Sequence, residues 1–305
     1  MKKFEKIVKS LNKFGASCLA LALLTSIATL GKISADEKKL IRIGVSPSPH
    51  AEIIEQIKGE LEEKGIKIEV QEFTDYNTPN LALAEGDIDA NYFQHIPFFD
   101  DFKEKENLDL EILCGVHIEP MGIYSEKHKS LDELEDGAEI FIPEDTVNGA
   151  RALALLQANG IITLKEDAGL EATERDIVDN PKNIKITALE AATLAQTYGD
   201  ADFAVINGNY AIQNGLNPLK DSLALENEKS PYTNIIAVRT GDAKKEEFQA
   251  LKEALQSEKV KDFIEKKYEG AVVYAAYDPD KDDKVSEESS ASDSKNSEST
   301  DKENK

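Results

Sequence analysis

The chain is 305 residues long, the length of two ordinary domains or of one large α/β unit with an internal cleft. It carries 36 Lys and Arg against 59 Asp and Glu, a net charge of -23. This charge argues against nucleic acid as a partner, because phosphate binding depends on clustered basic side chains. Hydrophobic residues make up 40%, enough for a core, and Cys18 and Cys114 are too few for a disulfide framework or a four-ligand zinc site.

The N-terminus has the order of an export signal. Residues 1–35 contain six lysines and one glutamate, and the apolar stretch 14–30 is followed by small residues. Cleavage after Ala35 would make Asp36 the mature N-terminus. An uncleaved signal anchor is the alternative, because this stretch approaches the ~20 residues that span a bilayer. We therefore predict a signal peptide over residues 1–35 and an exported protein.

Cys18 raises the question of lipid attachment. A lipid-modified cysteine should follow the apolar stretch, whereas Cys18 precedes the run from Leu19 to Leu24. We interpret it as an ordinary residue of the signal peptide. The predicted location is the outer face of the cytoplasmic membrane or the medium, without a well-placed lipid-attachment cysteine.

The C-terminal segment 278–305 has the composition of a disordered tail. It contains seven serines and ten acidic residues and no aromatic residue. Such a segment cannot bury enough apolar surface to offset the entropy of ordering. A cation-binding or wall-associated tail is the functional alternative.

Between these ends, predicted strands alternate with predicted helices. Apolar or alternating runs predict strands at residues 40–46, 66–73, 110–124 (interrupted by Pro120), 138–143, 184–189, 203–207 and 234–239. Helical patterns open at Pro49 and His50 and close at Gly65, and recur at 80–85, 244–257 and 260–268. This alternation predicts an α/β fold with mostly parallel sheets, in which ligands bind at the carboxyl ends of strands.

The sequence lacks the common catalytic signatures. It contains no P-loop, no dinucleotide-binding glycine motif, no G-x-S-x-G and no H-E-x-x-H. The four histidines, His50, His95, His117 and His128, have no regular ligand spacing. We therefore predict no enzyme activity, no cofactor and no metal, with a metal site assembled in space from three histidines as the alternative.

Aromatic, amide and basic side chains collect instead where predicted strands end. These segments are 74–77, 91–95, 146–151, 207–210 and 230–234. Flat apolar walls with a few fixed donors suit a small amphipathic molecule. Arg151 is notable because arginine is rare here and its fork suits a carboxylate, although a surface ion pair is the plainer interpretation. Asn148 and Asn207 could equally be turn or cap residues.

Six segments of the chain, taken in order, are similar to a known family. They are FTDYNTPNLALAEGDIDANYFQHIPFFDDF (73–102), VHIEPMGIYSEKHKSLDELEDGAEIFIPED (116–145), NGARALALLQ (148–157), DIVDNPKNIKI (176–186), AVINGNYAIQNGLNP (204–218) and SPYTNIIAVR (230–239). They resemble the methionine-binding lipoprotein family, the substrate-binding subunits of methionine ABC importers. The resemblance runs almost collinearly from about Lys39 to about Val273.

The resemblance implies a two-lobed periplasmic-binding-protein fold (type II), with the ligand cleft between the lobes and two hinge crossings. Lobe one would be residues 36–122 plus 235–277, and lobe two residues 123–234. The implied ligand is L-methionine or a close analogue such as D-methionine, and the implied partners are a membrane permease and its ATPase subunit. We expect a monomer. A methionine-containing dipeptide or another small amino acid is the alternative ligand.

The resemblance also assigns roles to residues. Arg151 would grip the ligand's α-carboxylate, and Asn148, Asn207 and Asn234 would hold its amino and carboxylate groups. The wall around the thioether would be formed by Tyr76, Tyr92, Phe93 and His95. Two features depart from the family pattern: the absence of a well-placed lipid-attachment cysteine, and the tail after Tyr277.

Overall fold

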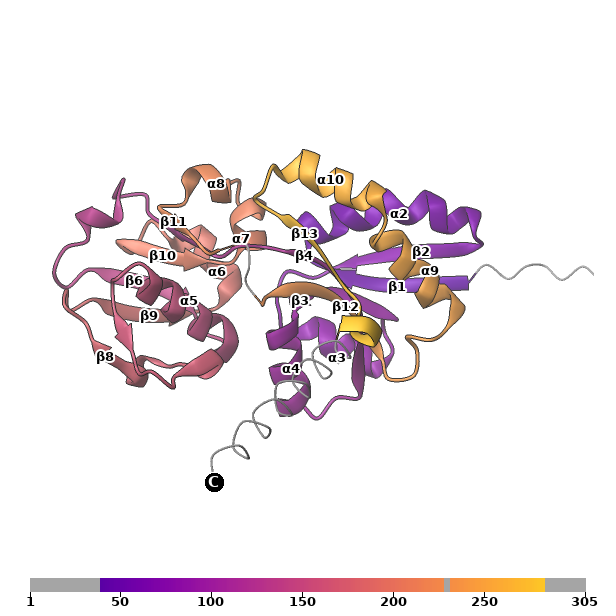
Figure 1. The fold of residues 1–305 in the computed structure, drawn as a ribbon, viewed down its shortest axis with the longest axis horizontal. Coiled ribbons are helices and arrows are strands. Elements are labelled where there is room, and N and C mark those ends of the chain that lie inside the picture. The colour runs from indigo at the N-terminus through magenta and orange to yellow at the C-terminus, as the bar shows by residue number, and fades with distance from the viewer. Residues whose placement is uncertain (1–38, 228–230, 283–305) are drawn as a thin grey trace, which may run out of the picture. The chain divides into compact units, whose positions relative to one another are not determined.

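The computed structural model describes residues 39–227 and 231–282, which form two mixed β-sheets covered by helices (Figure 1). The predicted signal peptide and residues 283–305 of the predicted tail lie outside the described residues. At the start of that tail, Asp278 is buried and its Oδ1 lies 2.6 Å from Lys252 Nζ.

The first sheet has six strands in the order β13-β4-β12-β3-β1-β2. Their bounds are β1 (Lys39–Val45), β2 (Ile66–Glu72), β3 (Ala90–His95), β4 (Leu110–Ile118), β12 (Thr233–Arg239) and β13 (Val273–Tyr277). Strand β1 pairs parallel with β2 and β3, whereas β12 pairs antiparallel with both β3 and β4. The central strands β3 and β12 are largely buried, as expected for a sheet covered on both faces, although β3 contains Asn91, Gln94 and His95.

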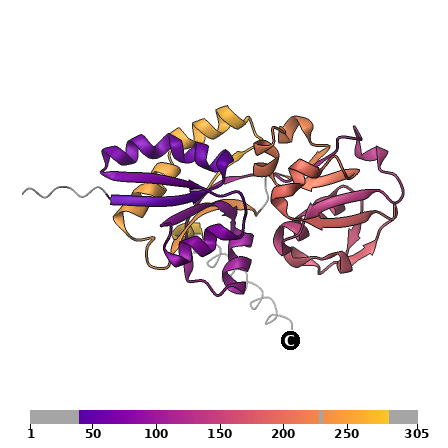
Figure 2. The ribbon, with the colours of Figure 1, turned by 180° about the vertical axis from the view of Figure 1, so that it is seen from behind.

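Helices cover both faces of this sheet, as the view from behind also shows (Figure 2). They are η1 (Pro47–Ala51), α2 (Glu52–Glu63), α3 (Thr78–Glu85), α4 (Ile96–Lys105), α9 (Glu246–Leu255) and α10 (Glu258–Tyr268). Helix α2 buries Ile53, Ile57 and Leu61 at helical spacing, and this face joins the core beneath α9 and α10. The predicted helices at 244–257 and 260–268 are confirmed as α9 and α10.

The second sheet has five strands in the order β11-β5-β10-β6-β9. Its strands are β5 (Gly122–Tyr124), β6 (Glu139–Pro143), β9 (Lys185–Leu189), β10 (Phe203–Ile206) and β11 (Ala224–Leu225), with a separate ribbon of β7 (Thr163–Leu164) and β8 (Ile177–Asp179). Around it lie α5 (Thr146–Ala158), α6 (Ala191–Thr197), α7 (Gly208–Gln213), α8 (Pro218–Asp221), and the short turns η2 (Leu131–Glu133), η3 (Gly169–Glu171) and η4 (Glu174–Asp176). This sheet has its own hydrophobic cores.

The chain passes between the sheets twice, from β4 to β5 and from β11 to β12. The sequence predicts a single interrupted strand over 110–124, but β4 ends at Ile118 and β5 begins at Gly122 in the other sheet. Pro120 lies at this break, and a proline without an N–H cannot continue a central ladder. The interruption in the sequence pattern therefore marks a crossing between sheets.

Two other sequence expectations differ from the structure. The sheets are mixed rather than mostly parallel, because β5 and β12 enter each sheet from the other one instead of through a helical crossover. Helix α4 and strand β13 are not predicted from the sequence. Helix α4 begins directly at the end of β3, so no polar loop separates the two patterns.

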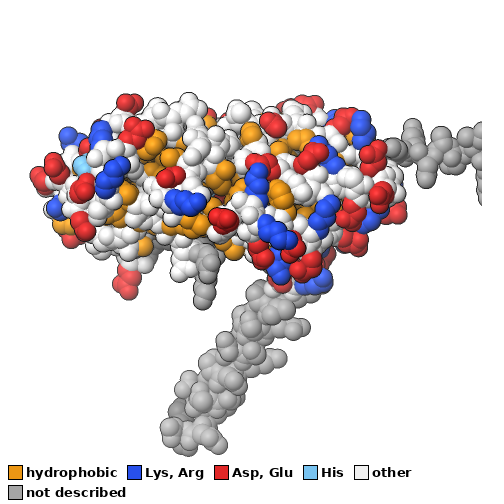
Figure 3. All heavy atoms as spheres, turned by 90° about the horizontal axis from the view of Figure 1, so that it is seen from above, with side chains coloured by type: hydrophobic (Ala, Val, Ile, Leu, Met, Phe, Trp, Pro, Cys, Tyr) orange, Lys and Arg blue, Asp and Glu red, His pale blue; other side chains and the backbone are white. Residues whose placement is uncertain are grey.

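The charge of the chain is spread over its surface. On the face shown in Figure 3, acidic and basic side chains lie interspersed. Ion pairs between residues four apart occur at the end of α2, Lys64–Glu60 at 3.0 Å, and in α4, Lys105–Asp101 at 2.9 Å. Such exposed pairs stabilise the fold little, and they bear on solubility rather than on the ligand.

The buried strand β12 offers a direct test of the core. Ile236 is 0% exposed, so we expect Ile236→Ala to lower the free energy of unfolding by about 2–5 kcal/mol through lost burial and the cavity left behind. Leu40→Ala is the matched control, because Leu40 is 46% exposed on β1 and should cost less than about 1 kcal/mol. Urea titration measures both, and equal losses would contradict this packing.

Candidate ligand-binding site

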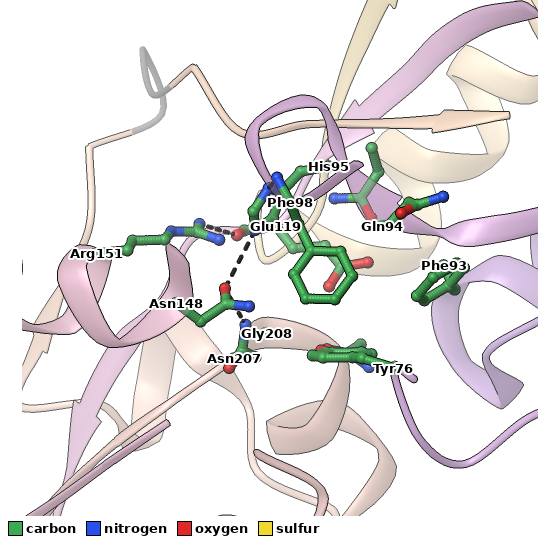
Figure 4. A pocket seen from close by; sticks show the side chains of 12 residues that line it. Tyr76, Phe93, Gln94, His95, Phe98, Glu119, Asn148, Arg151, Asn207 and Gly208 are labelled. Atoms are coloured by element: carbon green, nitrogen blue, oxygen red, sulfur yellow. Dashed lines mark hydrogen bonds between the residues drawn. The ribbon is translucent and has the colours of Figure 1, made fainter. Parts of the chain in front are cut away.

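A small cavity lies between the two sheets (Figure 4). Its lining comes from both sheets and from the segments that connect them. The lining residues are Tyr76, Phe93, Gln94, His95, Phe98, Glu119, Asn148, Arg151, Asn207, Gly208, Asn209 and Asn234.

One side of the cavity is aromatic. Tyr76 precedes α3, Phe93 lies on β3 and Phe98 lies on α4. The centroid of the Tyr76 ring is 6.0 Å from that of Phe93 and 5.8 Å from that of Phe98, which places all three in edge or tilted contact. Such rings form an apolar and polarisable wall.

The other side carries Arg151, which is 4% exposed on α5. Its Nε and Nη2 both donate to the Glu226 carboxylate, Nη2 also donates to Glu119 O at 2.8 Å, and the guanidinium lies 4.0 Å from the centre of the Tyr232 ring. The sequence suggests two parallel hydrogen bonds from this fork to a ligand carboxylate. Glu226 takes that edge here, and the other terminal nitrogen, Nη1, takes no part in these hydrogen bonds.

A network of side chains fixes the amide of Asn148. Its Oδ1 accepts from His95 Nε2 at 3.1 Å and from Asn207 Nδ2 at 2.9 Å, and its Nδ2 donates to Asp145, the N-cap of α5. His95 has the hydrogen on Nε2 because its Nδ1 accepts from the Phe98 N–H at 3.2 Å. Asn148 is thus saturated with protein partners and positions its neighbours.

Two buried atoms of the lining have no hydrogen-bond partner among the described residues: Asn207 Oδ1 and Asn209 Nδ2. One is an acceptor and the other a donor. Buried polar groups nearly always have hydrogen-bond partners. An unpartnered acceptor and an unpartnered donor in one cavity therefore indicate a ligand that has both a donor and an acceptor.

Glu119 is the acidic residue of the cavity lining. Its Oε1 lies 2.7 Å from His117 Nε2 and 3.4 Å from His50 Nε2, and Tyr92 Oη lies 2.5 Å from His117 Nδ1. Burial raises the pKa of Glu119, opposed by His50, Arg151 and a backbone hydrogen bond from Asn209. Burial also lowers the pKa of His50 to about 4 and that of His117 to about 3, so both rings are neutral near pH 7.

His50, His117 and Glu119 offer atoms within 4.8 Å of one another, a grouping that a metal ion could use. Their hydrogen bonds favour a different role. His50 Nε2 faces the acceptors Asn234 Oδ1 and Glu119 Oε1, and its Nδ1 is buried without a partner among the described residues. The hydrogen therefore lies on Nε2, the nitrogen that faces Glu119, and moving it to Nδ1 would leave a buried donor unpaired.

Seven of the eight residues singled out by the sequence line this cavity, and Tyr92 does not. Tyr92 is fully buried and its hydroxyl bonds to His117. The pairing of β3 with β12 shifts between Tyr92 and Gln94, so simple alternation along the strand does not assign these side chains, and the Tyr92 hydroxyl lies against His117 instead of the cavity. Ligand contact by these residues remains a prediction.

Five lining residues are not among the eight site residues assigned from the sequence. Gln94, Gly208 and Asn209 lie within the segments 91–95 and 207–210 that the sequence picks out, whereas Phe98 and Glu119 lie outside all of those segments. One feature of the sequence could have indicated Glu119 as a site residue: it is a charged residue, followed by Pro120, inside an otherwise apolar run. Gly208 is required where α7 approaches Glu119, since a Cβ there would lie 2.9 Å from Glu119 Cβ.

The fold and the cavity define a two-lobed binding protein for a small molecule, the first lobe built on the six-stranded sheet and the second on the five-stranded sheet. Within residues 39–227 and 231–282, no helix has the length and apolar character needed to cross a membrane. Residues 41–276 match the family model described as NlpA lipoprotein.

Known proteins are similar over most of the chain. Methionine-binding lipoprotein MetQ of Bacillus subtilis (strain 168) is 46% identical over 244 residues, 77% of this chain and 88% of that protein. D-methionine-binding lipoprotein MetQ of Escherichia coli (strain K12) is 39% identical and covers 86% of this chain and 98% of its own length. A nutrient-binding protein from Burkholderia cenocepacia, solved bound to methionine, superimposes with a TM-score of 0.75 at 43% identity, covering 77% of this chain and 99% of that one.

The chain belongs to the NlpA lipoprotein family, a family of substrate-binding lipoproteins and not of enzymes.

The buried histidines predict how stability depends on pH. Burial lowers the pKa of His95 and His117 to about 3 and that of His50 to about 4, so below pH 6.5 the unfolded chain binds protons that the folded chain does not. The free energy of unfolding should therefore fall as the pH is lowered from about 6.5 toward 4, by up to about 1.4 kcal/mol per pH unit for each histidine. The raised pKa values of Glu119 and Asp145 act in the opposite direction.

Urea titrations between pH 7.5 and 4.5 measure this dependence. His95→Gln should reduce the slope, because it removes a group that takes up a proton on unfolding. A slope unchanged by His95→Gln would contradict the burial of a neutral ring at this position.

Proposed function

We propose that the protein is the extracytoplasmic substrate-binding subunit of an ABC importer and that it binds methionine in the cavity between its lobes. The observation that carries this proposal is the polarity of the cavity. Glu119 and Arg151 supply opposite charges at the polar side, and three aromatic rings form the other side. A zwitterionic amino acid with a thioether side chain matches both sides, and similar proteins are named for methionine.

The proposed contacts follow from the free hydrogen-bonding capacity. Arg151 Nη1 binds the ligand's α-carboxylate, and Glu119 together with the unpartnered Asn207 Oδ1 binds its ammonium group. Tyr76, Phe93 and Phe98 pack against the thioether, a soft group that gains ~0.3–1.5 kcal/mol per aromatic contact. Asn148, Asn234 and His95 complete the wall, and Asn148 acts mainly by fixing its neighbours.

The proposed lobes are residues 36–122 plus 235–277 and residues 123–234, with the two crossings between the sheets as hinges. Closure of the lobes encloses the ligand, as in hinge-bending receptors generally. A membrane permease with its ATPase subunit accepts the ligand from the closed monomer. We place the exported protein at the outer face of the cytoplasmic membrane or in the medium, with Cys18 as a residue of the signal.

A methionine-containing dipeptide is the second candidate ligand. A second hollow of about 730 Å³ shares Tyr76 and Phe98 with the binding cavity and is lined further by Asp145, Glu190 and Tyr210. Room beyond the aromatic wall would accommodate a second residue. Competition between methionine and methionyl peptides in calorimetry distinguishes the two ligands, since a dipeptide receptor binds the peptide more tightly.

The polar contacts predict the effect of two substitutions. Arg151→Ala and Asn234→Ala should each weaken methionine binding about 10- to 150-fold, because each leaves a charged or buried partner unpaired at a cost of ~1.5–3 kcal/mol. Isothermal titration calorimetry measures the dissociation constants. Arg175→Ala is the control, because Arg175 is exposed on η4 and away from the cavity. Wild-type affinity in both cavity variants would refute the assignment of the polar side.

The aromatic wall predicts a preference for sulfur. Norleucine replaces the thioether sulfur by a methylene of similar size, so it should bind about twofold to tenfold more weakly than methionine. Competition calorimetry with L-norleucine, L-methionine and D-methionine measures this preference and the stereochemical one. Norleucine binding tighter than methionine would contradict a sulfur-aromatic contribution.

A further inference from the structure

We propose that Asn209 is an additional ligand-binding residue and that Tyr76, from the other lobe, holds its side-chain amide in the binding orientation. A second donor for the ligand's carboxylate, besides Arg151, is then assembled only when the two lobes meet. The inference rests on the proposed function, because it takes an amino-acid zwitterion as the ligand.

The hydrogen bonds of Asn209 determine which end of its amide is free. Asn209 is 2% exposed in the first turn of α7 and lines the cavity. Its Oδ1 accepts from Tyr76 Oη at 2.6 Å, whereas its Nδ2 is buried without a partner among the described residues. Since an amide has one oxygen and one NH₂ group, the bond from Tyr76 to the oxygen leaves the donor end available.

The chemistry of the free end selects the ligand group. A buried N–H without an acceptor is destabilising, so a bound ligand that accepts from it is favoured. In an amino-acid zwitterion the ammonium group cannot accept and a thioether sulfur accepts only weakly. The carboxylate is the remaining acceptor. Asn207 Oδ1, two residues away, is free with the opposite polarity and suits the ammonium group.

Tyr76 is held firmly enough to serve as the orienting group. Its ring centroid lies 4.9 Å from that of Tyr210 and 5.8 Å from that of Phe98, so it packs against both lobes. Burial raises the pKa of its hydroxyl well above the ordinary value, which keeps the hydroxyl protonated as a donor. Because Tyr76 belongs to the first lobe and Asn209 to the second, separation of the lobes would release the amide.

Tyr210 provides a matched control. Its hydroxyl also joins the lobes, donating to the backbone carbonyl of Thr74 at 3.1 Å. The main chain already fixes the direction of a backbone carbonyl, so this hydrogen bond does not orient a side chain. Neither Tyr210 nor Thr74 lines the binding cavity. Tyr210→Phe therefore removes one hydrogen bond between the lobes without releasing a side-chain amide.

The test is a double-mutant cycle on the full chain, with the dissociation constant for L-methionine measured by calorimetry. Tyr76→Phe should weaken binding about 5- to 30-fold and Asn209→Ala at least as much, whereas Tyr210→Phe should change it less than about threefold. The double variant Tyr76→Phe with Asn209→Ala should have a dissociation constant within about threefold of that of Asn209→Ala alone. Once the Asn209 amide is removed, the Tyr76 hydroxyl has nothing left to orient.

Asn209→Asp keeps the oxygen that accepts from Tyr76 and replaces the donor by a second oxygen. Asn209→Asp should bind methionine more weakly than Asn209→Ala does, because the aspartate carboxylate repels the carboxylate of the ligand. This variant also tests the proposal if Asn209→Ala fails to fold. Thermal unfolding of every variant checks the fold.

Wild-type affinity in Asn209→Ala or Asn209→Asp, or additive losses in the double variant, would overturn the role of Asn209 while leaving the proposed function standing. Failure of the wild-type protein to bind methionine would overturn both.

Discussion

A carboxylate is buried where the chain crosses from one lobe to the other, and the cavity is organised around it. Glu119 is 6% exposed between β4 and β5, and burial disfavours its charged form. His50, His117 and a backbone N–H of Asn209 surround it with hydrogen-bond donors, and Gly208 permits α7 to approach. These groups compensate part of the desolvation of the carboxylate, and a bound cationic group would compensate more.

The positive charge opposite it is constrained in the same way. Arg151 gives one edge of its guanidinium to Glu226 and packs on Tyr232, so its position is set by the protein before any ligand arrives. Preorganised groups of this kind lose little freedom on binding. The excess of acidic residues elsewhere in the chain therefore says little about the ligand, because the ligand meets the groups of the site, Glu119 and the ion-paired Arg151 and Glu226, and not the net charge of the surface.

Much of the fold and of this site follows from the sequence, and the exceptions have physical reasons. Alternation of strands and helices predicts the α/β class, and polar residues after strands predict Asn148, Arg151 and Asn207. Tyr92 is the counterexample, because without the register of β3 nothing in the sequence tells which of two adjacent aromatic residues faces the cavity.

Glu119 and Glu226 are harder to predict, each for a different reason. Glu119 interrupts a run that resembles one continuous strand, so the crossing between the lobes is visible only in three dimensions. Glu226 is 75 residues from Arg151 in sequence, and no local pattern links the two. Pairings of this kind depend on how the two sheets meet and not on the periodicity of either partner.

The central claim is that the cavity binds free methionine. Native mass spectrometry of the protein, purified without unfolding and then supplied with L-methionine, tests it most directly. The account predicts a one-to-one adduct with the mass of methionine, already present after purification or formed on addition. A protein that stays empty in the presence of L-methionine, or that retains a different small molecule which methionine does not displace, would contradict the account.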